Sequence, residues 1–454
     1  MPDTALLNKY NVQVPRYTSY PTVPAWEDNL DVNRWQHIFR RDFEATNAQK
    51  GISLYIHLPF CESLCTYCGC NKKITTNHGV EMEYVDAILE EWRIYSSLMT
   101  EKPVIRELHL GGGTPTFFSP ANLEKLLTGI FKTAIIHPDH EFSFEGHPNN
   151  TTKEHLQKLY DLGFRRVSFG IQDNDPEVQH IINRHQPFEN VQFVTATARQ
   201  IGYKSVNYDL IYGLPKQTVT SITRTILQTI SQRPDRVAFY SYAHVPWTSR
   251  GQRLFDEHDL PSAAEKLELY RTGRELFLQN GYVDIGMDHF ALPADDLNKA
   301  SEAGKLHRNF MGYTTQATNM LIGLGVSSIS STGKAFAQNS KTIHNYYQSI
   351  ANGTLAVEKG FFLSEEDVRF GNYILDISCR GKTTFQPEDT GTINELCMPE
   401  LKSLEADKLI EIEPTGMHIT PLGKNFIRNI CSAFDLYLQR NKASQEKKIF
   451  SRAI

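Results

Sequence analysis

The hydrophobic positions in the middle of the chain alternate between a strand period and a helix period. Six short runs rich in β-branched and aromatic residues predict strands; they are "SLYIHLP", "IRELHLGGG", "EFSFEGHP", "RRVSFGIQ", "SVNYDLIYGLP" and "RVAFYSYAHVP". Between them apolar residues recur at i, i+3, i+4 and i+7, as at Val85, Ile88, Leu89 and Trp92, a spacing that predicts amphipathic helices. Further helices are expected at 123–130, 189–201, 218–231 and 262–280.

Strand–helix units in succession predict an α/β fold with a parallel sheet and helices outside it. Six units rather than eight indicate a partial (β/α)6 TIM-like barrel. "SP" at 119–120 and the capping-box pattern "TTKE" at 151–154 mark helix starts. The unusual motifs "GGGTPT", "EGHP", "GIQD" and "YGLP" each follow a predicted strand. Because parallel strands carry functional groups at their carboxyl ends, one face of the barrel should hold the site.

The pattern divides the chain into three parts. Residues 1–50 contain Pro15, Pro21 and Pro24, which oppose a helix and predict an N-terminal arm of extended chain. Residues 51–360 hold the barrel and its extensions. Residues 361–454 predict a small helical, winged-helix-like domain with a hairpin at Pro414-Thr415-Gly416, followed by a short basic tail.

Composition narrows the class of protein. The chain has 454 residues and a formal charge of -5, so nothing predicts a nucleic-acid partner. No run approaches the roughly 18 apolar residues of a membrane span, and the N-terminus lacks the apolar centre of a signal peptide. Seven cysteines, an odd number, favour reduced thiols in the cytoplasm over a disulfide framework.

Four of the seven cysteines fall in the stretch "CESLCTYCGC". Structural zinc normally uses paired cysteines separated by a longer loop, and no distant second pair follows here. A four-cysteine iron–sulfur site usually has its fourth ligand further away. The third alternative uses Cys61, Cys65 and Cys68, spaced C-x3-C-x2-C, to bind three irons of a [4Fe–4S] cluster and leaves the fourth iron open.

That spacing, after the first strand of a βα repeat and followed one unit later by "GGGTP", resembles the radical S-adenosylmethionine (SAM) enzymes. The resemblance implies a radical SAM barrel in which the cluster cleaves SAM to a carbon radical that takes hydrogen from an unactivated C–H bond. The glycines of "GGGTP" let backbone approach the methionine end of SAM.

Further motifs, from "PRYTSYPT" through "NYDLIYGLPKQT", "GMDHFA" and "LHRNFMGYTTQ" to "FSRAI", resemble the oxygen-independent coproporphyrinogen III oxidase family over nearly the whole chain. This resemblance implies that two propionates of coproporphyrinogen III become vinyl groups, giving protoporphyrinogen IX in anaerobic haem biosynthesis. Each step releases CO2 and consumes one SAM, and two SAM sites are expected. A low-potential donor such as flavodoxin or ferredoxin, an unidentified electron acceptor and a monomeric state are also expected.

The family's site positions can be matched to this chain. The resemblance implies cluster ligation by Cys61, Cys65 and Cys68, and SAM contacts from Tyr55, Tyr67, Gly112, Gly113, Thr114, Glu145, Gln172, Arg184, Asp209, Ala243 and Ile329. Tyr55, His57, Glu145 and Cys70 are the candidate catalytic residues. His57 lies one alternation beyond Tyr55, on the same side of its strand. Cys70 is expected near the site without binding the cluster, and a packed thiol is its alternative.

Other positions have two readings. Arg16 and Arg308 are candidates to bind substrate carboxylates, which suit planar guanidinium donors. Asp288 and His289 are expected to be packed and hydrogen-bonded. His147 stands where many family members carry an acidic residue. Two alternative relatives are a haem-binding chaperone, which usually lacks "PRYTSYP" and the Cys70 position, and a haem-degrading methyltransferase, which should diverge in its C-terminal half.

Overall fold

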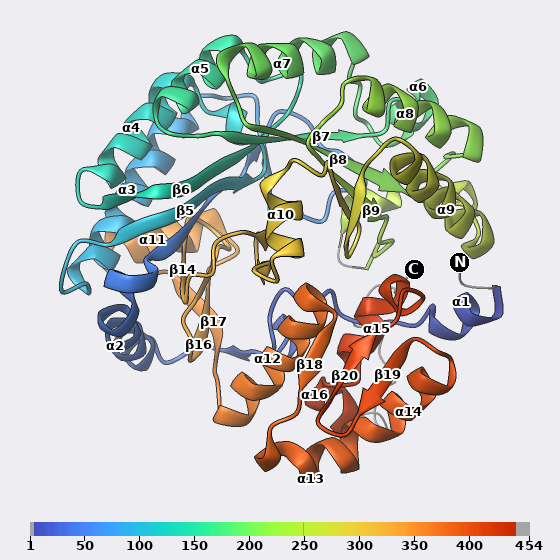
Figure 1. Cartoon of the computed structure of the whole chain (residues 1–454). Helices are drawn as coiled ribbons and strands as arrows, with labels where there is room; N and C mark the ends of the chain where they lie inside the picture. Colours follow the sequence, from blue (N-terminus) through green and yellow to red (C-terminus); the bar gives the residue numbers. More distant parts are fainter. Residues whose placement is uncertain (1–3, 248, 442–454) are drawn as a thin grey trace.

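Six parallel strands form the centre of the molecule, as the sequence predicts. The computed structural model describes residues 4–247 and 249–441. The strands are neighbours in chain order (Figure 1): β2 (Ile52–Leu58), β5 (Val104–Gly112), β6 (Ile135–Gly146), β7 (Arg166–Gln172), β8 (Ser205–Tyr212) and β9 (Arg236–Ser241). Their parallel register brings all their carboxyl ends to one edge.

Helices cover the outside of these strands (Figure 1). They are α3 (Val80–Ser97), α4 (Pro120–Phe131), α5 (Lys153–Asp161), α6 (Pro176–Ile181), α7 (Phe188–Ile201), α8 (Val219–Ser231) and α9 (Ala263–Gln279). Ser119 caps α4 with Pro120 in its first turn, as predicted. The capping box of α5 lies one residue later than predicted, because Thr152 is the N-cap and His155 reaches back to it.

Short strands extend the sheet on both sides of the barrel. The full order is β1-β17-β16-β15-β14-β2-β5-β6-β7-β8-β9-β11-β10. The added strands are β1 (Glu27–Asp28), β10 (Val283–Gly286), β11 (His289–Ala291), β14 (Met320–Leu324), β15 (Ile329–Ser331), β16 (Ala335–Asn339) and β17 (Val357–Phe362). Of these, only β14 is parallel to its barrel neighbour. Since the described sheet begins at β1 and ends at β10 without pairing back, the barrel is partial.

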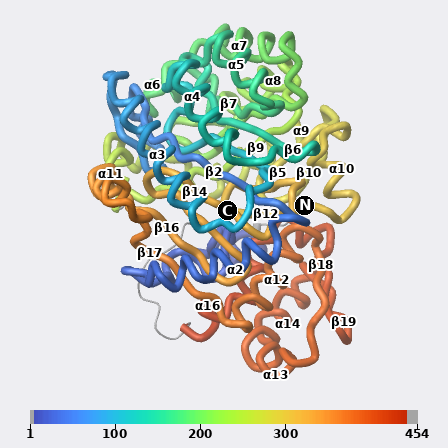
Figure 2. Tube along the Cα trace, turned by 90° about the vertical axis from the view of Figure 1, so that its left-hand side faces the viewer, coloured from blue at the N-terminus to red at the C-terminus, as the bar shows by residue number. Residues whose placement is uncertain are grey.

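The expectation of extended chain through residue 50 is wrong for its second half. Residues 32–50 form α2 (Val32–Lys50), which Asp31 caps at its start. Trp35, Phe39 and Phe43 repeat every four residues and are buried, so the helix packs an aromatic stripe against the barrel. The proline-rich stretch before it contains no α-helix after α1 (Thr4–Tyr10). Figure 2 shows α2 crossing between the barrel and the C-terminal helices.

The C-terminal part is a small helical unit with a three-stranded sheet, and its hairpin turns where predicted. Its elements are α12 (Glu365–Arg380), α13 (Thr390–Thr392), α14 (Met398–Ala406), α15 (Ile427–Ser432), α16 (Leu436–Arg440), β18 (Lys382–Thr384), β19 (Ile410–Glu413) and β20 (Gly416–Ile419). Tyr10 of the N-terminal segment packs here, with its ring 5.3 Å from that of Phe426. The boundaries at residues 50 and 360 stay a prediction, and "FSRAI" lies outside the described residues.

The remaining elements are connections around this frame. They are α10 (Asp296–Glu302), α11 (Ile343–Ala351), β3 (Phe60–Cys61), β4 (Lys73–Ile74), β12 (His307–Asn309) and β13 (Gly312–Thr314). No helix in the described ranges is both long and apolar enough to cross a membrane.

Candidate active site

A cavity of about 620 Å³ opens at the carboxyl ends of the barrel strands. Most of the predicted site residues line it: Cys61, Cys65, Tyr67, Cys68, Cys70, Gly112, Gly113, Thr114, Glu145, Gln172, Arg184 and Asp209. These residues come from the ends of four barrel strands, from the loop after β2 and, for Arg184, from the segment after α6. The parallel register therefore gathers into one cavity residues that the sequence spreads over about 150 positions.

The cysteine loop borders this cavity with free thiols. All seven cysteines are unpaired, and Cys70 is exposed. The Thr114 hydroxyl donates to Cys61 Sγ at 3.3 Å, and Arg184 Nη1 lies 3.6 Å from Cys65 Sγ. A hydrogen bond from Cys70 lowers the pKa of Cys68 to about 6, although burial opposes it. Cys70 thus adjoins Cys68, one of the three predicted ligands.

These residues fit an iron–sulfur cluster. Within the described ranges, no three His, Cys, Asp or Glu side chains converge as they stand on a point that could hold a metal ion. The three predicted cysteines instead stand along the wall of a cavity, with hydrogen-bond donors on two of their sulfurs. Donors to ligand sulfurs are a means by which proteins tune such clusters.

The glycine turn after β5 is pressed against the start of the cysteine loop. Gly113 N donates to Leu58 O at 2.8 Å, and a Cβ on Gly113 would lie 2.5 Å from Pro59 O. Gly112 has a φ of +112°, and its Cβ would lie 2.7 Å from the His57 ring. Only glycine fits at Gly112 and Gly113 without a clash. Since both residues line the cavity, their backbone is exposed in its wall without side chains.

Tyr55 and His57 lie beneath the cavity rather than in its wall. Tyr55 Oη is 3.0 Å from His57 Nδ1, and His57 Nε2 is 2.9 Å from Asn71 O. A carbonyl oxygen only accepts, so His57 Nε2 carries the proton and Nδ1 accepts from Tyr55. Burial lowers the pKa of His57, so the ring is neutral and ties β2 to the end of the cysteine loop.

Two carboxyl groups, Glu145 and Asp209, line the cavity, and their pKa values are shifted in opposite directions. Burial tends to raise the pKa of Glu145, but His109 and the Gly112 N–H outweigh it and hold that pKa below its usual value. Burial, and after it the Glu145 charge, raises the pKa of Asp209 to about 7. Glu145 is therefore the permanent anion of the site, and His109 is a partner that the sequence analysis missed. Its place one alternation after buried Glu107, in "RELHL", was the available signal.

The far wall of the cavity is built on Arg184. Arg184 is buried rather than solvated, because the residue is only 8% exposed and its guanidinium donates to Gly170 O. Its neighbour Gln172 has a φ of +67° at the end of β7. His147 also lines the cavity; burial, and then the Arg184 charge, lowers its pKa to about 2. His147 stands where many family members carry an acidic residue, and its neutral ring therefore brings no charge to this position.

Ala243 and Ile329 do not line this cavity. Ala243 is nevertheless joined to the cysteine loop through Gln252, whose Nε2 donates to Ala243 O at 3.1 Å and to Tyr67 O at 3.0 Å. Gln252 is buried and was missed, because nothing in its sequence surroundings marks it. Ile329 begins β15, and its backbone packs against Gly323, the β14 partner of Tyr55.

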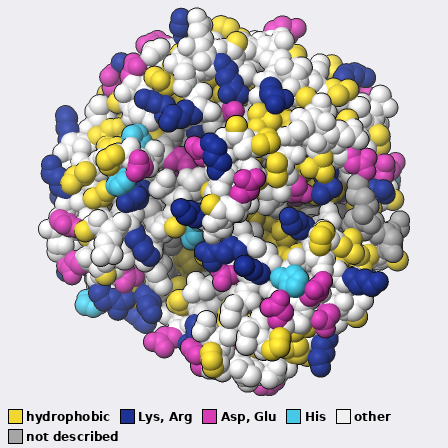
Figure 3. All heavy atoms as spheres, in the orientation of Figure 1, with side chains coloured by type: hydrophobic (Ala, Val, Ile, Leu, Met, Phe, Trp, Pro, Cys, Tyr) yellow, Lys and Arg dark blue, Asp and Glu magenta, His cyan; other side chains and the backbone are white. Residues whose placement is uncertain are grey.

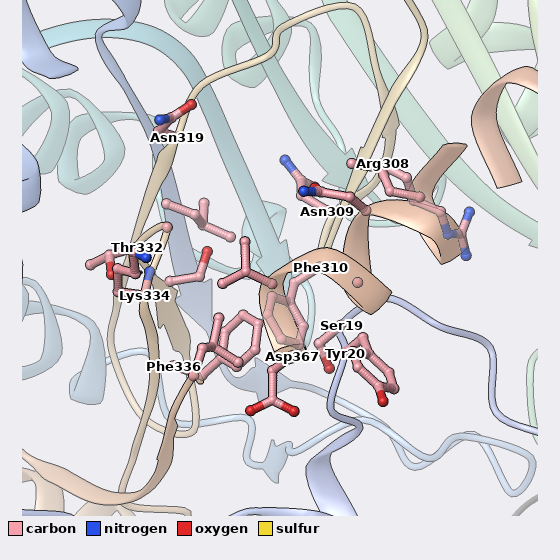
Figure 4. Close-up of a pocket in the computed structure, with 18 of the residues that line it drawn as sticks. Ser19, Tyr20, Arg308, Asn309, Phe310, Asn319, Thr332, Lys334, Phe336 and Asp367 are labelled. Atoms are coloured by element: carbon pink, nitrogen blue, oxygen red, sulfur yellow. The ribbon is translucent and has the colours of Figure 1, made fainter. Parts of the chain in front are cut away.

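Of two further cavities, one adjoins this site and the other lies apart from it. The adjoining cavity, of about 180 Å³, shares Glu145, Asp209 and Tyr240 with the first and reaches into the barrel. Another, of about 510 Å³, lies where the N-terminal segment, β14–β16 and α12 meet (Figure 4). His289 lines the smaller one and is hydrogen-bonded to Met287 O at 2.8 Å.

Comparisons with known proteins agree with this architecture. The model of the radical SAM superfamily matches residues 55–228. The oxygen-independent coproporphyrinogen III oxidase of Pseudomonas aeruginosa is 39% identical over 100% of this chain and 98% of its own length. That of Escherichia coli strain K12 is 37% identical over 100% and 98%.

A solved structure extends the likeness to three dimensions. Coproporphyrinogen III oxidase from Escherichia coli, described as a radical SAM enzyme, superposes with a TM-score of 0.88 and 35% identity, over 94% of this chain and 100% of that one. Membership of the superfamily implies a [4Fe–4S] cluster and SAM, which the cysteine loop and its cavity fit. The chain belongs to the oxygen-independent coproporphyrinogen III oxidase family of radical SAM enzymes.

Proposed function

We propose that the protein is an oxidoreductase that converts coproporphyrinogen III into protoporphyrinogen IX in anaerobic haem biosynthesis. The observation that carries this proposal is the full-length match to named relatives, together with the three-cysteine loop on a cavity at the carboxyl ends of the strands. Each of two propionate side chains, –CH2–CH2–COO⁻, loses a hydrogen atom, an electron and CO2 and becomes –CH=CH2. The electron passes to an acceptor outside the chain.

We propose that Cys61, Cys65 and Cys68 hold the cluster and that the glycine turn holds the methionine end of SAM. When bound, the cluster and SAM supply a carbon radical that can remove hydrogen from the propionate. Glu145, anionic beside the Gly112 N–H, suits the ammonium group of SAM, and Arg184 suits a carboxylate.

The remaining predicted residues orient this machinery. Tyr55 and His57 support the cysteine loop from below. Gln252 sets the distance between Tyr67 and Ala243, two of the predicted SAM contacts. We further propose two SAM sites, one for each decarboxylation, with Ile329 at the second. A low-potential donor such as flavodoxin or ferredoxin would reduce the cluster, and the protein would act as a monomer.

The test is an anaerobic incubation of iron-reconstituted protein with coproporphyrinogen III, SAM, reductant and a cell-extract acceptor. Protoporphyrin IX is followed by fluorescence after oxidation, and 5′-deoxyadenosine is counted beside it. We expect about one 5′-deoxyadenosine per CO2 released. Deoxyadenosine without vinyl product would contradict the substrate. Neither product, with tight haem binding, would favour the haem-chaperone alternative.

A further inference from the structure

Two arginines stand side by side at the junction of the N-terminal segment and the barrel. Arg16 Nη2 donates to Ser241 O at 3.2 Å, and its guanidinium lies 5.6 Å from the centroid of the Tyr240 ring. Arg308 Nη2 lies 3.5 Å from the carbonyl oxygen of Arg16. Tyr240 lines both the cysteine cavity and the smaller cavity beneath it. The arginine pair is therefore next to the candidate active site without being part of the predicted SAM set.

Arg308 has more hydrogen-bond donors than there are acceptors within reach of them. Its Nε and Nη1 atoms are buried and have no hydrogen-bond partner among the described residues. Its guanidinium lies 4.8 Å from the Tyr313 ring centroid. In Figure 4 Arg308 stands on the opposite side of the 510 Å³ cavity from Thr332 and Lys334. Because a buried unpaired donor is unfavourable, the side chain is built to receive an acceptor.

The charge around the pair is positive. Arg428 donates to Val14 O and Pro15 O, directly before Arg16. Burial, and after it the Arg16 charge, lowers the pKa of Arg428 to about 10. The acidic side chain placed among these arginines is Asp288, whose pKa burial raises in spite of them. On the face drawn in Figure 3, Lys and Arg side chains lie around the hollow near the middle, with Asp and Glu side chains among them.

We infer that Arg16 and Arg308 form a carboxylate site that binds a propionate of the tetrapyrrole, an inference that rests on the proposed function. A guanidinium matches a carboxylate with two parallel hydrogen bonds, and coproporphyrinogen III carries four propionates. Because the pair lies beyond Tyr240, a propionate held there is not the one that reacts. It anchors the ring so that another propionate reaches the cysteine cavity.

A purely structural role leaves part of this arrangement unexplained. One hydrogen bond from each arginine suffices to attach the N-terminal segment, through Ser241 O and Arg16 O. Arg308 Nε and Nη1 contribute nothing to that attachment. These two donors lie on different edges of the guanidinium, so a carboxylate would satisfy one of them together with a hydrogen of Nη2.

The test measures binding of coproporphyrin III, the oxidised and unreactive relative of the substrate, by fluorescence titration. We expect R308Q and R16Q to weaken binding about ten- to a hundredfold, since hydrogen bonds to charged groups are the stronger class. R308K keeps the charge but not the paired donors, so its affinity for coproporphyrin III should lie between that of the wild type and that of R308Q. R93Q is the matched control, because among the described residues Arg93 pairs only with Glu90, on the surface of α3. Unchanged affinity in R308Q, with native circular dichroism, would overturn the inference.

A porphyrin with fewer carboxylates separates anchoring from general damage. Deuteroporphyrin IX has two propionates, so we expect R308Q to weaken its binding less than that of coproporphyrin III. Equal losses for both porphyrins would point to a structural defect and overturn the carboxylate site. If the wild type binds coproporphyrin III through both arginines but forms no vinyl product, the proposed function fails and the site stands. If vinyl product forms and R308Q keeps the wild-type KM and Kd, the site fails and the function stands.

Discussion

The hydroxyl of Tyr55 donates to Nδ1 of His57 at 3.0 Å, and the opposite ring nitrogen of His57 donates to Asn71 O at 2.9 Å. This chain of hydrogen bonds connects a barrel strand with the residue directly after Cys70. The two residues therefore hold the end of the cysteine loop, and the imidazole remains neutral because burial lowers its pKa.

His57→Ala should loosen the cysteine loop. Removing the ring leaves Asn71 O and the Tyr55 hydroxyl without partners, a loss of about 1 kcal/mol for each hydrogen bond. We expect less iron and sulfide per chain after anaerobic reconstitution, measured by colorimetric assay and by absorbance near the cluster band. His37→Ala, an exposed substitution on α2, is the control. Full cluster content in H57A would refute the supporting role.

Gly113→Ala should disturb the turn that is proposed to hold the methionine end of SAM. The new Cβ would lie 2.5 Å from Pro59 O, and backbone cannot move aside as a flexible side chain can. We expect a loss of about 1–3 kcal/mol in the free energy of unfolding and weaker SAM binding by calorimetry. Gly391→Ala is the matched control, because a Cβ there meets nothing within 4 Å. Equal stability of the two variants would contradict the close approach.

Glu91 should make stability depend on pH. It is fully buried and accepts from Gly325 N, Asn339 Nδ2 and Tyr346 Oη at 2.7, 2.6 and 2.8 Å. Burial raises its pKa to about 7 from an ordinary 4.5. The folded state thus binds a proton more tightly than the unfolded state. This contribution to stability is present below pH 4.5 and is lost as pH rises through 7, on the order of 3 kcal/mol in all.

Denaturant unfolding between pH 5 and 8 tests this expectation. Wild-type stability should fall with rising pH more steeply than that of E91Q, whose amide does not titrate. E91Q should also be less stable than the wild type at pH 5, since its amide nitrogen faces donors. E90Q, at the neighbouring position paired with Arg93, should keep the wild-type slope. Parallel curves for E91Q and the wild type would rule out titration of Glu91.

Gln252→Leu should separate two parts of the SAM site. Gln252 links Tyr67 O and Ala243 O through one amide nitrogen, and leucine has similar size but no donor. We expect KM for SAM to rise roughly tenfold while iron content stays unchanged, because the cysteine ligands are not touched. Gln157→Leu, at an exposed position on α5, is the control. A parallel loss of iron and SAM affinity would mean that Gln252 supports the whole loop instead.

The local sequence determined much of this protein. The two periodicities locate the six barrel strands and their helices, because burial on one face of a helix, or within a covered parallel strand, leaves a readable pattern. The spacing of Cys61, Cys65 and Cys68 and the glycines of the following unit identify the family, because their chemistry is confined to short segments.

The tertiary structure decided what depends on residues distant in the chain. Helix α2 escaped the sequence analysis because the nearby prolines suggested extended chain, although they end at Pro24 and Asp31 begins the helix. The strands β10, β11 and β15 span only three or four residues, too few to show a period. His109 and Gln252 acquire their roles only when the parallel register brings them close to the cavity. The sequence names Arg16 and Arg308 singly as carboxylate candidates, but only the folded-back N-terminal segment brings them together, since a hydrogen bond across 185 or 292 residues leaves no local signature.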